Sequence, residues 1–377
     1  MKITAVDAIV LDHQPAGTPR PAPHGAQDPL IIRIRTDGGI TGYGEADTFA
    51  PVARAIVRAP RETVIASGLA ALLAGRDPLD EGLWAELFLA TSFYGRGGVV
   101  AHTLAGIDLA LWDIRGKAAG KPASELLGGR RRDRVRTYAT TGMPASPADL
   151  PQVVAACREA GFTRVKFGLG AHPAPPAEHA DLIAAARDAV GEQTEFMIDV
   201  GRRWSDAEAA VKLVAAVERC RPGWIEEPFQ PEEHAAYRTL TAASAIPIST
   251  GEADSVPAEY AAIVADGVAI VQPDVCRAGG FGTCLEVERL ALAAGRRCIP
   301  HEWGSGIAKA GALQLLAAMQ ADELFEYRIT EPPVMASLVA EKFPVSDGTV
   351  AVPSGPGLGI TVDDELLDWL LADGGTA

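Results

Sequence analysis

Short apolar runs that each end on an ionisable residue recur along the second half of the chain. The residues that end these runs are Lys166, Asp199, Glu226, Glu252, Asp274, His301 and Glu326. Their numbers differ by 33, 27, 26, 22, 27 and 25, which is about the length of one strand, loop and helix unit of a closed parallel barrel. Because the carboxyl ends of barrel strands open onto one face, the pattern predicts that these side chains converge on one pocket.

Helix-start patterns support the phase of this repeat. Ser146-Pro147 places proline at a first helical position, and Ser205 with Glu208 has the spacing of a capping box. The predicted barrel strands are residues 134–138, 163–167, 195–199, 223–226, 247–250, 268–273, 297–300 and 323–327. We therefore expect an α/β fold with a parallel barrel over residues 131–330.

The first 130 residues have a different pattern, typical of a separate α+β domain. Strand-like alternation covers residues 2–12 and 30–36, and a turn at Asp37-Gly38-Gly39 leads into a third strand over residues 40–45. The long loop rich in Pro and Gly between the first two strands is expected to be a lid. The three helices predicted to follow cover residues 52–73, 79–92 and 99–118.

Three further features carry structural expectations. Asp108 and Asp113 lie off the apolar stripe of the third helix, so we expect solvated or locally paired charges there. The basic run 130–136 is interpreted as a solvated or interface surface. Residues 331–377 break the repeat with Gly/Pro turns and short strands, so this segment is expected to leave the barrel and rejoin the N-terminal sheet.

Composition narrows the functional classes. The chain has 34 Lys and Arg against 49 Asp and Glu, and this net charge of -15 argues against nucleic acid or an anionic membrane as partner. The 5 cysteines have no CxxC spacing, which favours neither a disulfide framework nor a zinc site. The N-terminus does not resemble a secretory signal, and no apolar run of about 18 residues is present. These observations together favour a cytoplasmic protein.

Three of the strand-end acids predict a metal site. Asp199, Glu226 and Glu252 end consecutive strands and offer only carboxylate oxygens, which suit Mg²⁺ better than zinc. Any one of them alone is as easily a solvated or N-cap acid, but three at successive strand ends favour metal binding. Glu227 points to the opposite face of its strand and is interpreted as structural.

Asp274 and His301 end adjacent strands and predict a general base. The carboxylate can hold one imidazole nitrogen and leave the other facing the pocket. A buried Lys166 near the acids is expected to stay protonated and to bind a substrate carboxylate, or to act as acid or base once a metal offsets the acids. Glu326 is expected to be held protonated by neighbouring negative charge and to donate a hydrogen bond to an enolate oxygen, the alternative being a surface ion pair.

With these residues in hand, the chain resembles the enolase superfamily, and within it the mandelate racemase subgroup, over nearly its whole length. The matching stretches are TDGGITGYGEA at 36–46, GIDLALWDIRGKAAGKPASELLGG at 106–129, WIEEP at 224–228, STGE at 249–252, QPDVCRAGG at 272–280, IPHEWGSGI at 299–307 and PSGPGLGI at 353–360. The resemblance implies a (β/α)7β modified TIM barrel, a capping domain completed by the C-terminal segment, and assembly into a homo-oligomer.

By position, the resemblance also assigns roles to the strand-end residues. It implies one Mg²⁺ per subunit on Asp199, Glu226 and Glu252. It implies the Asp274–His301 pair as general base and Glu326 as the electrophilic acid. Lys166 corresponds to the first lysine of the K-x-K pair of the subgroup.

Two positions depart from the pattern of the subgroup. The second lysine of the K-x-K pair is Gly168 here, and the Asn usually found two residues after the first metal ligand is Gly201. Racemisation needs a base on each face of the α-carbon, so the loss of the second lysine favours a reaction with one base.

The expected activity is a sugar-acid dehydratase. Removal of the α-proton of a sugar-acid carboxylate and loss of a β-hydroxyl would yield a 2-keto-3-deoxy acid. A lactone cycloisomerase uses the same residues and stays open, as does an epimerase with Lys166 acting alone on the second face. A metal-dependent sugar-acid binding protein is the non-enzymatic alternative.

The substrate is expected to be an aldonate, an aldarate or a lactone, selected by loops of the N-terminal part. The residues expected to contact it are Arg20, His24, Phe49, Tyr94 and Arg96, with Phe93 as a further possibility. Arg20 or Arg96 would meet the second carboxylate of an aldarate, the alternative being that they face water.

Overall fold

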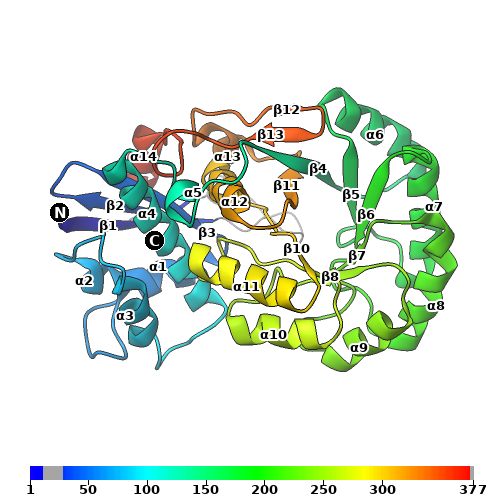
Figure 1. Cartoon of the computed structure of the whole chain (residues 1–377), viewed down its shortest axis with the longest axis horizontal. Coiled ribbons are helices and arrows are strands. Elements are labelled where there is room, and N and C mark those ends of the chain that lie inside the picture. Colours follow the sequence, from blue (N-terminus) through cyan, green and yellow to red (C-terminus); the bar gives the residue numbers. More distant parts are fainter. Residues whose placement is uncertain (12–28, 374–377) are drawn as a thin grey trace.

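The computed structural model describes residues 1–11 and 29–373 and shows two parts, a capping domain and a barrel (Figure 1). The capping domain begins with an antiparallel sheet in the order β1–β2–β3. Its strands are β1 (Ile3–Val10), β2 (Leu30–Thr36) and β3 (Thr41–Ala46), and its helices are α1 (Ala50–Arg58), α2 (Leu69–Leu73), α3 (Leu83–Ala90), α4 (Val99–Ala119) and α5 (Ala123–Leu126).

Glycines on β3 explain why α4 packs so closely on this sheet. A Cβ added at Gly44 would lie 1.9 Å from the carbonyl oxygen of Gly106, and one added at Gly42 would lie 2.2 Å from that of Ala110. Since no side chain fits between the two backbones, the TGYG segment of β3 allows the buried helix to lie directly against the strand.

The barrel is the expected α/β unit. Its parallel strands are β4 (Arg134–Gly142), β5 (Arg164–Gly168), β6 (Glu195–Asp199), β7 (Ile225–Glu226), β8 (Ile248–Thr250), β9 (Ile270–Val271), β10 (Arg297–Cys298) and β11 (Leu324–Arg328). The helices that follow the first seven of these are α6 (Leu150–Glu159), α7 (His179–Val190), α8 (Ala207–Val217), α9 (His234–Ala243), α10 (Pro257–Ala265), α11 (Phe281–Ala293) and α12 (Gly306–Ala318). Neighbouring strands pair in sequence order from β4 to β10, and β11 closes onto β4. The expected (β/α)7β order is confirmed.

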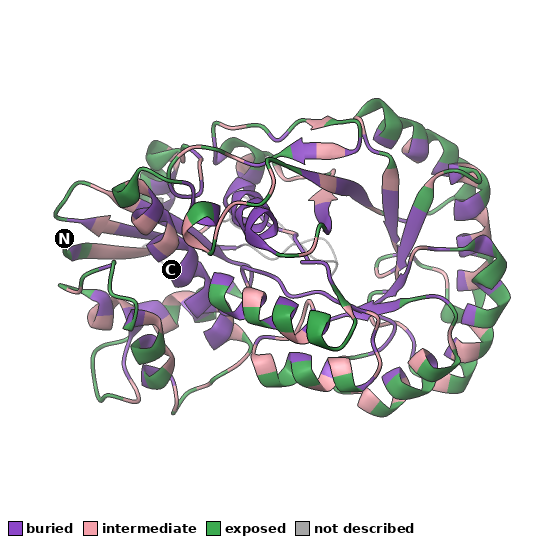
Figure 2. Cartoon of the chain, viewed as in Figure 1, coloured by how far each residue is buried: buried purple, intermediate pink, exposed green. Residues whose placement is uncertain are grey.

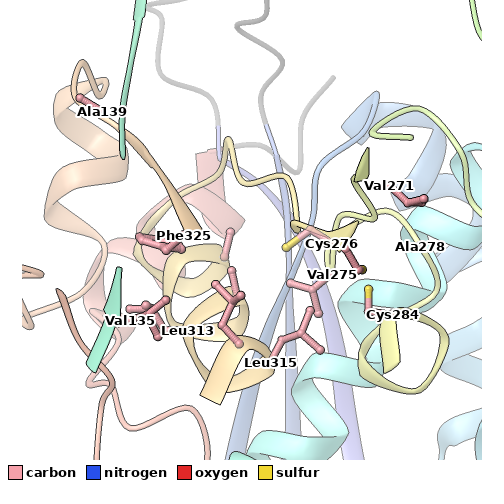
Figure 3. Close-up of a cluster of buried hydrophobic side chains, with 14 of the residues drawn as sticks. Val135, Ala139, Val271, Val275, Cys276, Ala278, Cys284, Leu313, Leu315 and Phe325 are labelled. Atoms are coloured by element: carbon pink, nitrogen blue, oxygen red, sulfur yellow. The ribbon is translucent and has the colours of Figure 1, made fainter. Parts of the chain in front are cut away.

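Helix α12 joins the two parts of the molecule. All of its residues are buried, and Figure 2 shows it enclosed between the capping domain and the barrel. The core continues around it: Leu313 and Leu315 of α12 lie in one apolar cluster with Phe325 of β11 and Cys284 of α11 (Figure 3). All five cysteines are buried and free. No helix among the described residues is both long and apolar enough to cross a membrane.

Several local expectations need correction. The helix predicted over 52–73 is divided, because Ala59 precedes Pro60 and has extended backbone with ψ 151°, which ends α1. The cap of α8 is Asp206 and not Ser205: its Oδ1 accepts from the backbone N–H groups of Glu208 and Ala209. The 3₁₀ turn at Pro147–Asp149 is capped by Ser146, as expected.

Asp108 and Asp113 are buried in the structure and are not solvated. Asp108 Oδ2 accepts from the backbone N–H of Phe281 at 2.9 Å, and Asp113 accepts from the N–H groups of Tyr43 and Leu358. Asp113 also makes the local pair with Lys117, at 2.7 Å. The two acids therefore hold α4 to the barrel, to β3 and to the C-terminal segment.

The basic run is only partly the solvated surface that was predicted: Arg131 and Arg134 are exposed, and several of its side chains also bind backbone carbonyl groups. Arg131 donates to the carbonyl oxygen of Ala318, Arg132 to that of Leu316, and Arg130 to that of Pro353. These side chains bind carbonyl groups at the end of α12 and in the C-terminal segment, which makes them a support for the base of the barrel.

The C-terminal segment divides between the two parts. It contains α13 (Pro333–Ser337), β12 (Val345–Ser346), β13 (Thr349–Ala351) and α14 (Asp364–Asp373). The strands do not join the N-terminal sheet as expected, because β13 pairs antiparallel with the start of β4. Helix α14 does return to that sheet, where Arg33 of β2 pairs with Asp364 and Asp368 (Figure 1).

Candidate active site

The lumen of the barrel has an apolar layer directly below its polar residues. This apolar layer consists of Tyr138, Met197, Trp224, Ile270, Ile299 and Leu324. Side chains two positions apart on a strand face the same side, so the next inward residues form a second layer nearer the carboxyl ends. That second layer contains Thr140, Asp199, Glu226, Gln272, His301 and Glu326, together with Lys166 of β5. The strand-end residues predicted from the sequence are thus brought to one place.

The three predicted metal ligands occupy adjacent positions. Asp199 pairs with Glu226 across β6 and β7, and Glu252 follows β8 by two residues. Burial, reinforced by the charges of Glu226 and Glu252, raises the pKa of Asp199 well above its usual range. Such a mutual effect means that the three carboxylates lie close enough for their negative charges to repel one another.

Lys166 is held as a cation inside this acidic group. Its ammonium forms an ion pair with Glu226 and another with Glu326, whose Oε1 lies 2.7 Å away. Burial lowers the pKa of Lys166, but the carboxylates of Glu226 and Glu326 outweigh it and raise the pKa well above its usual range. This agrees with the expectation of a protonated ammonium.

Glu326 has the opposite charge state to the one expected. It accepts a hydrogen bond from Thr140 Oγ1 at 2.8 Å in addition to its ion pair with Lys166. Burial raises the pKa of the Glu326 carboxyl, but Lys166 and His301 outweigh it and lower the pKa below its usual value. The expectation of a protonated Glu326 considered the neighbouring acids and not the adjacent ammonium.

The predicted Asp274–His301 pair is formed. His301 Nδ1 lies 2.7 Å from Asp274 Oδ2, and Asp274 is itself held by the backbone N–H of Cys276 at 2.7 Å. Since a carboxylate accepts, Nδ1 carries the proton and Nε2 faces the other acids, 3.3 Å from Glu252 Oε2. Burial lowers the pKa of His301, but Glu252 and Asp274 outweigh it and raise the pKa to about 10.

Two arginines that the sequence argument did not include complete the charge network. Arg202 donates to Glu227 Oε2 and to Glu252 Oε1, both at 2.6 Å, which confirms a structural contact for Glu227. Arg277 pairs with Asp47 of the capping domain at 2.6 Å and donates to the Glu252 carbonyl oxygen. Arg202 lies three residues after Asp199 in D-V-G-R, and Arg277 lies three residues after Asp274 in D-V-C-R. This shared spacing could have identified both arginines.

The ion pairs of the site keep Glu252 ionised and decide how the carboxylates of Glu226 and Glu252 are oriented. Burial raises the pKa of Glu252, but His301, Arg277 and Arg202 outweigh it and lower the pKa to about 2. In the part of the chain that the structure describes, no three His, Cys, Asp or Glu side chains are grouped as a metal site as they stand. Glu226 and Glu252 direct oxygens at Lys166 and Arg202 instead.

The donor chemistry nevertheless fits a divalent cation. Asp199, Glu226 and Glu252 offer mutually repelling carboxylates at adjacent strand ends, Glu226 buried and the other two half-buried, and hard oxygen donors of this kind suit Mg²⁺. Reorientation of the Glu226 and Glu252 side chains is needed to bring their oxygens together. The ligand assignment therefore rests on residue type and position.

The two departures from the subgroup pattern have different structural settings. Gly168 pairs with Asp199 across the sheet, and an added Cβ would lie 3.8 Å from Asp199 Oδ2 in ordinary contact. A side chain at 168 would face the site, and this chain has none there. Gly201 has φ 62°, and a Cβ would lie 2.7 Å from the Cα of Gly170, so no side chain fits there.

The predicted substrate contacts have other surroundings. Tyr94 donates to the Ser67 carbonyl oxygen at 2.7 Å, and the Arg96 guanidinium lies 4.6 Å from the centre of the Phe88 ring, both inside the capping domain. Phe49 and Phe93 are 59% and 77% exposed. Arg20 and His24, like the predicted lid, lie outside the described residues. Contact of any of these residues with a substrate stays a prediction.

Comparison with known proteins identifies the family. Residues 6–128 match the N-terminal domain of mandelate racemase and muconate lactonizing enzyme, and residues 150–366 match the enolase C-terminal domain-like family. A D-galactarolactone cycloisomerase of Agrobacterium fabrum is 34% identical over 99% of this chain and 100% of its own. A D-galactonate dehydratase of Xanthomonas axonopodis pv. citri is 34% identical over 91% of each chain.

A solved structure agrees with this assignment. The 3,6-anhydro-D-galactonate cycloisomerase of Zobellia galactanivorans has a TM-score of 0.86 at 28% identity, over 98% of this chain and 99% of the other. The capping sheet, the (β/α)7β barrel and the two family matches lead to one conclusion. The chain belongs to the mandelate racemase and muconate lactonizing enzyme group of the enolase superfamily.

Proposed function

We propose that this enzyme removes the α-proton of a sugar-acid carboxylate and expels a β-hydroxyl as water, yielding a 2-keto-3-deoxy acid. The observation that carries the proposal is the arrangement around one base. His301 is held by Asp274 with Nε2 facing the acidic group, and Gly168 leaves no lysine at the position from which a second base would act. A reaction that needs one base is therefore favoured over racemisation.

The acids and Lys166 have distinct roles in this proposal. Asp199, Glu226 and Glu252 would hold one Mg²⁺, which when bound supplies positive charge that acidifies the α-proton. Lys166, kept protonated by Glu226 and Glu326, binds the substrate carboxylate and stabilises the negative charge that develops on it. Glu326 acts as an ionised partner that positions this ammonium.

The proton balance requires only His301. A cation bound by the acids would offset the negative charge that raises the pKa of His301, which leaves Nε2 neutral. Neutral Nε2 takes the proton from C2, and the electron pair of that C–H bond forms the C2–C3 double bond as the C3–O bond breaks. His301 then returns the proton to the departing hydroxyl, which leaves as water. The enol gains a proton at C3 from solvent, releases the proton of its C2 hydroxyl to solvent and becomes the 2-keto acid.

A lactone cycloisomerase is the second candidate. It is favoured by the D-galactarolactone cycloisomerase relative, which matches 99% of this chain and 100% of its own length. In that reaction His301 removes the proton α to the free carboxylate, and the lactone ring oxygen leaves the neighbouring β-carbon in place of a hydroxyl. Both proposed reactions use the same base, so the leaving group distinguishes them.

Turnover of a matched substrate panel tests the proposal. Galactonate, galactarate and galactarolactone are incubated with the enzyme and Mg²⁺ in deuterated water and followed by proton NMR and by semicarbazide detection of keto acids. Keto-acid formation from an open-chain acid supports the dehydratase, and ring opening of the lactone alone supports the cycloisomerase. Deuterium at C2 of recovered substrate with inverted configuration would contradict both and indicate an epimerase. Binding without any exchange or turnover would indicate a sugar-acid binding protein.

A further inference from the structure

Arg328 is an arginine that faces the lumen one layer beyond the polar ring. It ends β11, on which Leu324 belongs to the apolar lumen layer and Glu326 to the polar layer. Phe325 and Tyr327 point outward, where their rings meet edge to face with centroids 5.9 Å apart. Alternation along the strand therefore places Arg328 on the inner face, nearer the mouth than Glu326.

The contacts of Arg328 are with carbonyl groups and an aromatic ring. Nε donates to the Thr330 carbonyl oxygen at 2.6 Å and Nη1 to that of Trp303 at 3.3 Å. The guanidinium carbon lies 4.5 Å from the centre of the Trp303 ring. Trp303 follows His301 by two residues, so Arg328 is attached to the loop that carries the proposed base.

Arg328 differs from the other cations at the carboxyl ends of the barrel strands, because those cations form ion pairs with acids of the site. Lys166 pairs with Glu226 and Glu326, and Arg202 with Glu227 and Glu252. No Asp or Glu within residues 1–11 and 29–372 forms an ion pair with Arg328. Burial lowers the pKa of Arg328 below its usual range, and the nearby acids offset only part of this.

A carboxylate bound at Arg328 would satisfy this cation. The guanidinium is held on one edge by two carbonyls and on one face by Trp303, and its remaining N–H groups suit the two oxygens of a carboxylate. Glu326, which pairs with Lys166, lies two residues before Arg328 on β11. Two residues along a strand span about 6.6 Å, comparable with the length of an extended six-carbon chain. A sugar acid with its reacting carboxylate at Lys166 can therefore reach Arg328 with its other end.

We propose that Arg328 binds a second carboxylate at the far end of the substrate, so that the preferred substrate is a sugar diacid or the lactone of one. The inference rests on the proposed function, which places the reacting carboxylate at Lys166. Recognition of a diacid would then depend on Arg328 of the barrel, and not on Arg20 or Arg96 of the N-terminal part, as predicted from the sequence.

Direct binding tests this assignment. Galactarate and galactonate have the same hydroxyl configuration and differ at C6, where one has a carboxylate and the other an alcohol. Isothermal titration of each in the presence of Mg²⁺ gives the ratio of their dissociation constants for the protein with Arg328, for Arg328→Gln and for Arg328→Lys, each in a His301→Asn background so that neither acid is turned over. Arg289→Gln is the control, because Arg289 is an exposed arginine of α11.

The protein with Arg328 is expected to bind galactarate more tightly than galactonate by about 10- to 100-fold, the range of one charge-assisted bidentate contact. Arg328→Gln should abolish this preference, Arg328→Lys should restore part of it, and Arg289→Gln should leave it unchanged. Equal affinity of the protein with Arg328 for both acids, or an unchanged ratio in Arg328→Gln, would overturn the inference. Absence of keto acid and of α-proton exchange would instead overturn the proposed function, because binding is measured without turnover.

Discussion

The lumen of the barrel contains two layers of side chains that come from the same strands and differ in chemistry. Six strands each contribute an apolar residue and then, two positions later, a polar one. The pairs are Tyr138 and Thr140, Met197 and Asp199, Trp224 and Glu226, Ile270 and Gln272, Ile299 and His301, and Leu324 and Glu326. About 6.6 Å of strand therefore separates packed core from the residues proposed to do chemistry.

The two layers are stabilised in different ways. The apolar layer is held by exclusion from water and by contacts such as the edge-to-face pair of Tyr138 and Trp224. The polar layer is also buried, except for the half-buried Asp199, and depends on pairing, because an unpaired buried charge is strongly unfavourable. A substitution in the lower layer should therefore act on stability, and one in the upper layer on chemistry.

The largest effect is expected from His301→Asn in the polar layer. Loss of the only proposed base should lower kcat by about 10²- to 10⁴-fold and remove α-proton exchange measured by NMR in deuterated water. Mg²⁺ affinity and the melting temperature should change little, since Asn retains a polar partner for Asp274. Retained exchange would transfer the role of base to Lys166.

Glu252→Gln tests the metal assignment in the same layer. The substitution removes a proposed ligand, so the Mg²⁺ dissociation constant from calorimetry should rise by more than the roughly 10- to 100-fold typical of losing an outer-shell partner. Glu195→Gln is the control, because Glu195 is an exposed residue at the far end of β6 that pairs with Arg164. An unchanged dissociation constant in Glu252→Gln would remove this residue from the ligand set.

Leu324→Ala is the matching change in the apolar layer. The cavity should cost about 2–5 kcal/mol of the free energy of unfolding, seen as a lower melting temperature or denaturation midpoint. The activity of the protein that remains folded should fall far less than in His301→Asn. A loss of kcat as large as that of His301→Asn without a loss of stability would contradict the separation of the two layers.

Gly168→Lys should have the smallest effect and sharpens the one-base interpretation. It restores a lysine at the position facing Asp199, where the neighbouring carboxylates would keep the ammonium protonated. We therefore expect exchange of the α-proton of the opposite epimer that is detectable by NMR and slow relative to elimination. Gly168→Ala serves as the control for occupying the space. Exchange as fast as that supported by His301 would show that one missing lysine alone separates this enzyme from an epimerase.

Much of the barrel follows from local pattern. Each strand begins and ends within a few residues of its expected position, because each is a short apolar run that ends at an ionisable residue or a turn. The convergence of Lys166, Asp199, Glu226, Asp274 and His301 also follows, since a parallel barrel brings all strand ends to one face. These expectations required only the spacing of residues along the chain.

Other features depend on contacts between residues far apart in the sequence. Asp108 lies off the apolar stripe of its helix, where a surface acid is expected. In the structure it is buried and accepts a hydrogen bond from the Phe281 N–H of α11. The short strand β13 contains no indication that it pairs with β4 and not with the N-terminal sheet. Pairing partners of such brief elements are decided by which edge the folded chain brings near them.

The charge states of the site divide in the same way. The sequence by itself determined which ionisable groups gather at the mouth, because that depends on residue type and on the period of the repeat. Only the tertiary structure decided that Lys166 keeps Glu326 ionised, that Arg202 holds Glu252, and that Arg328 lies on Trp303. The physical reason is that the pKa and the partner of a buried group depend on burial and on distances of a few ångströms, which no one-dimensional spacing specifies.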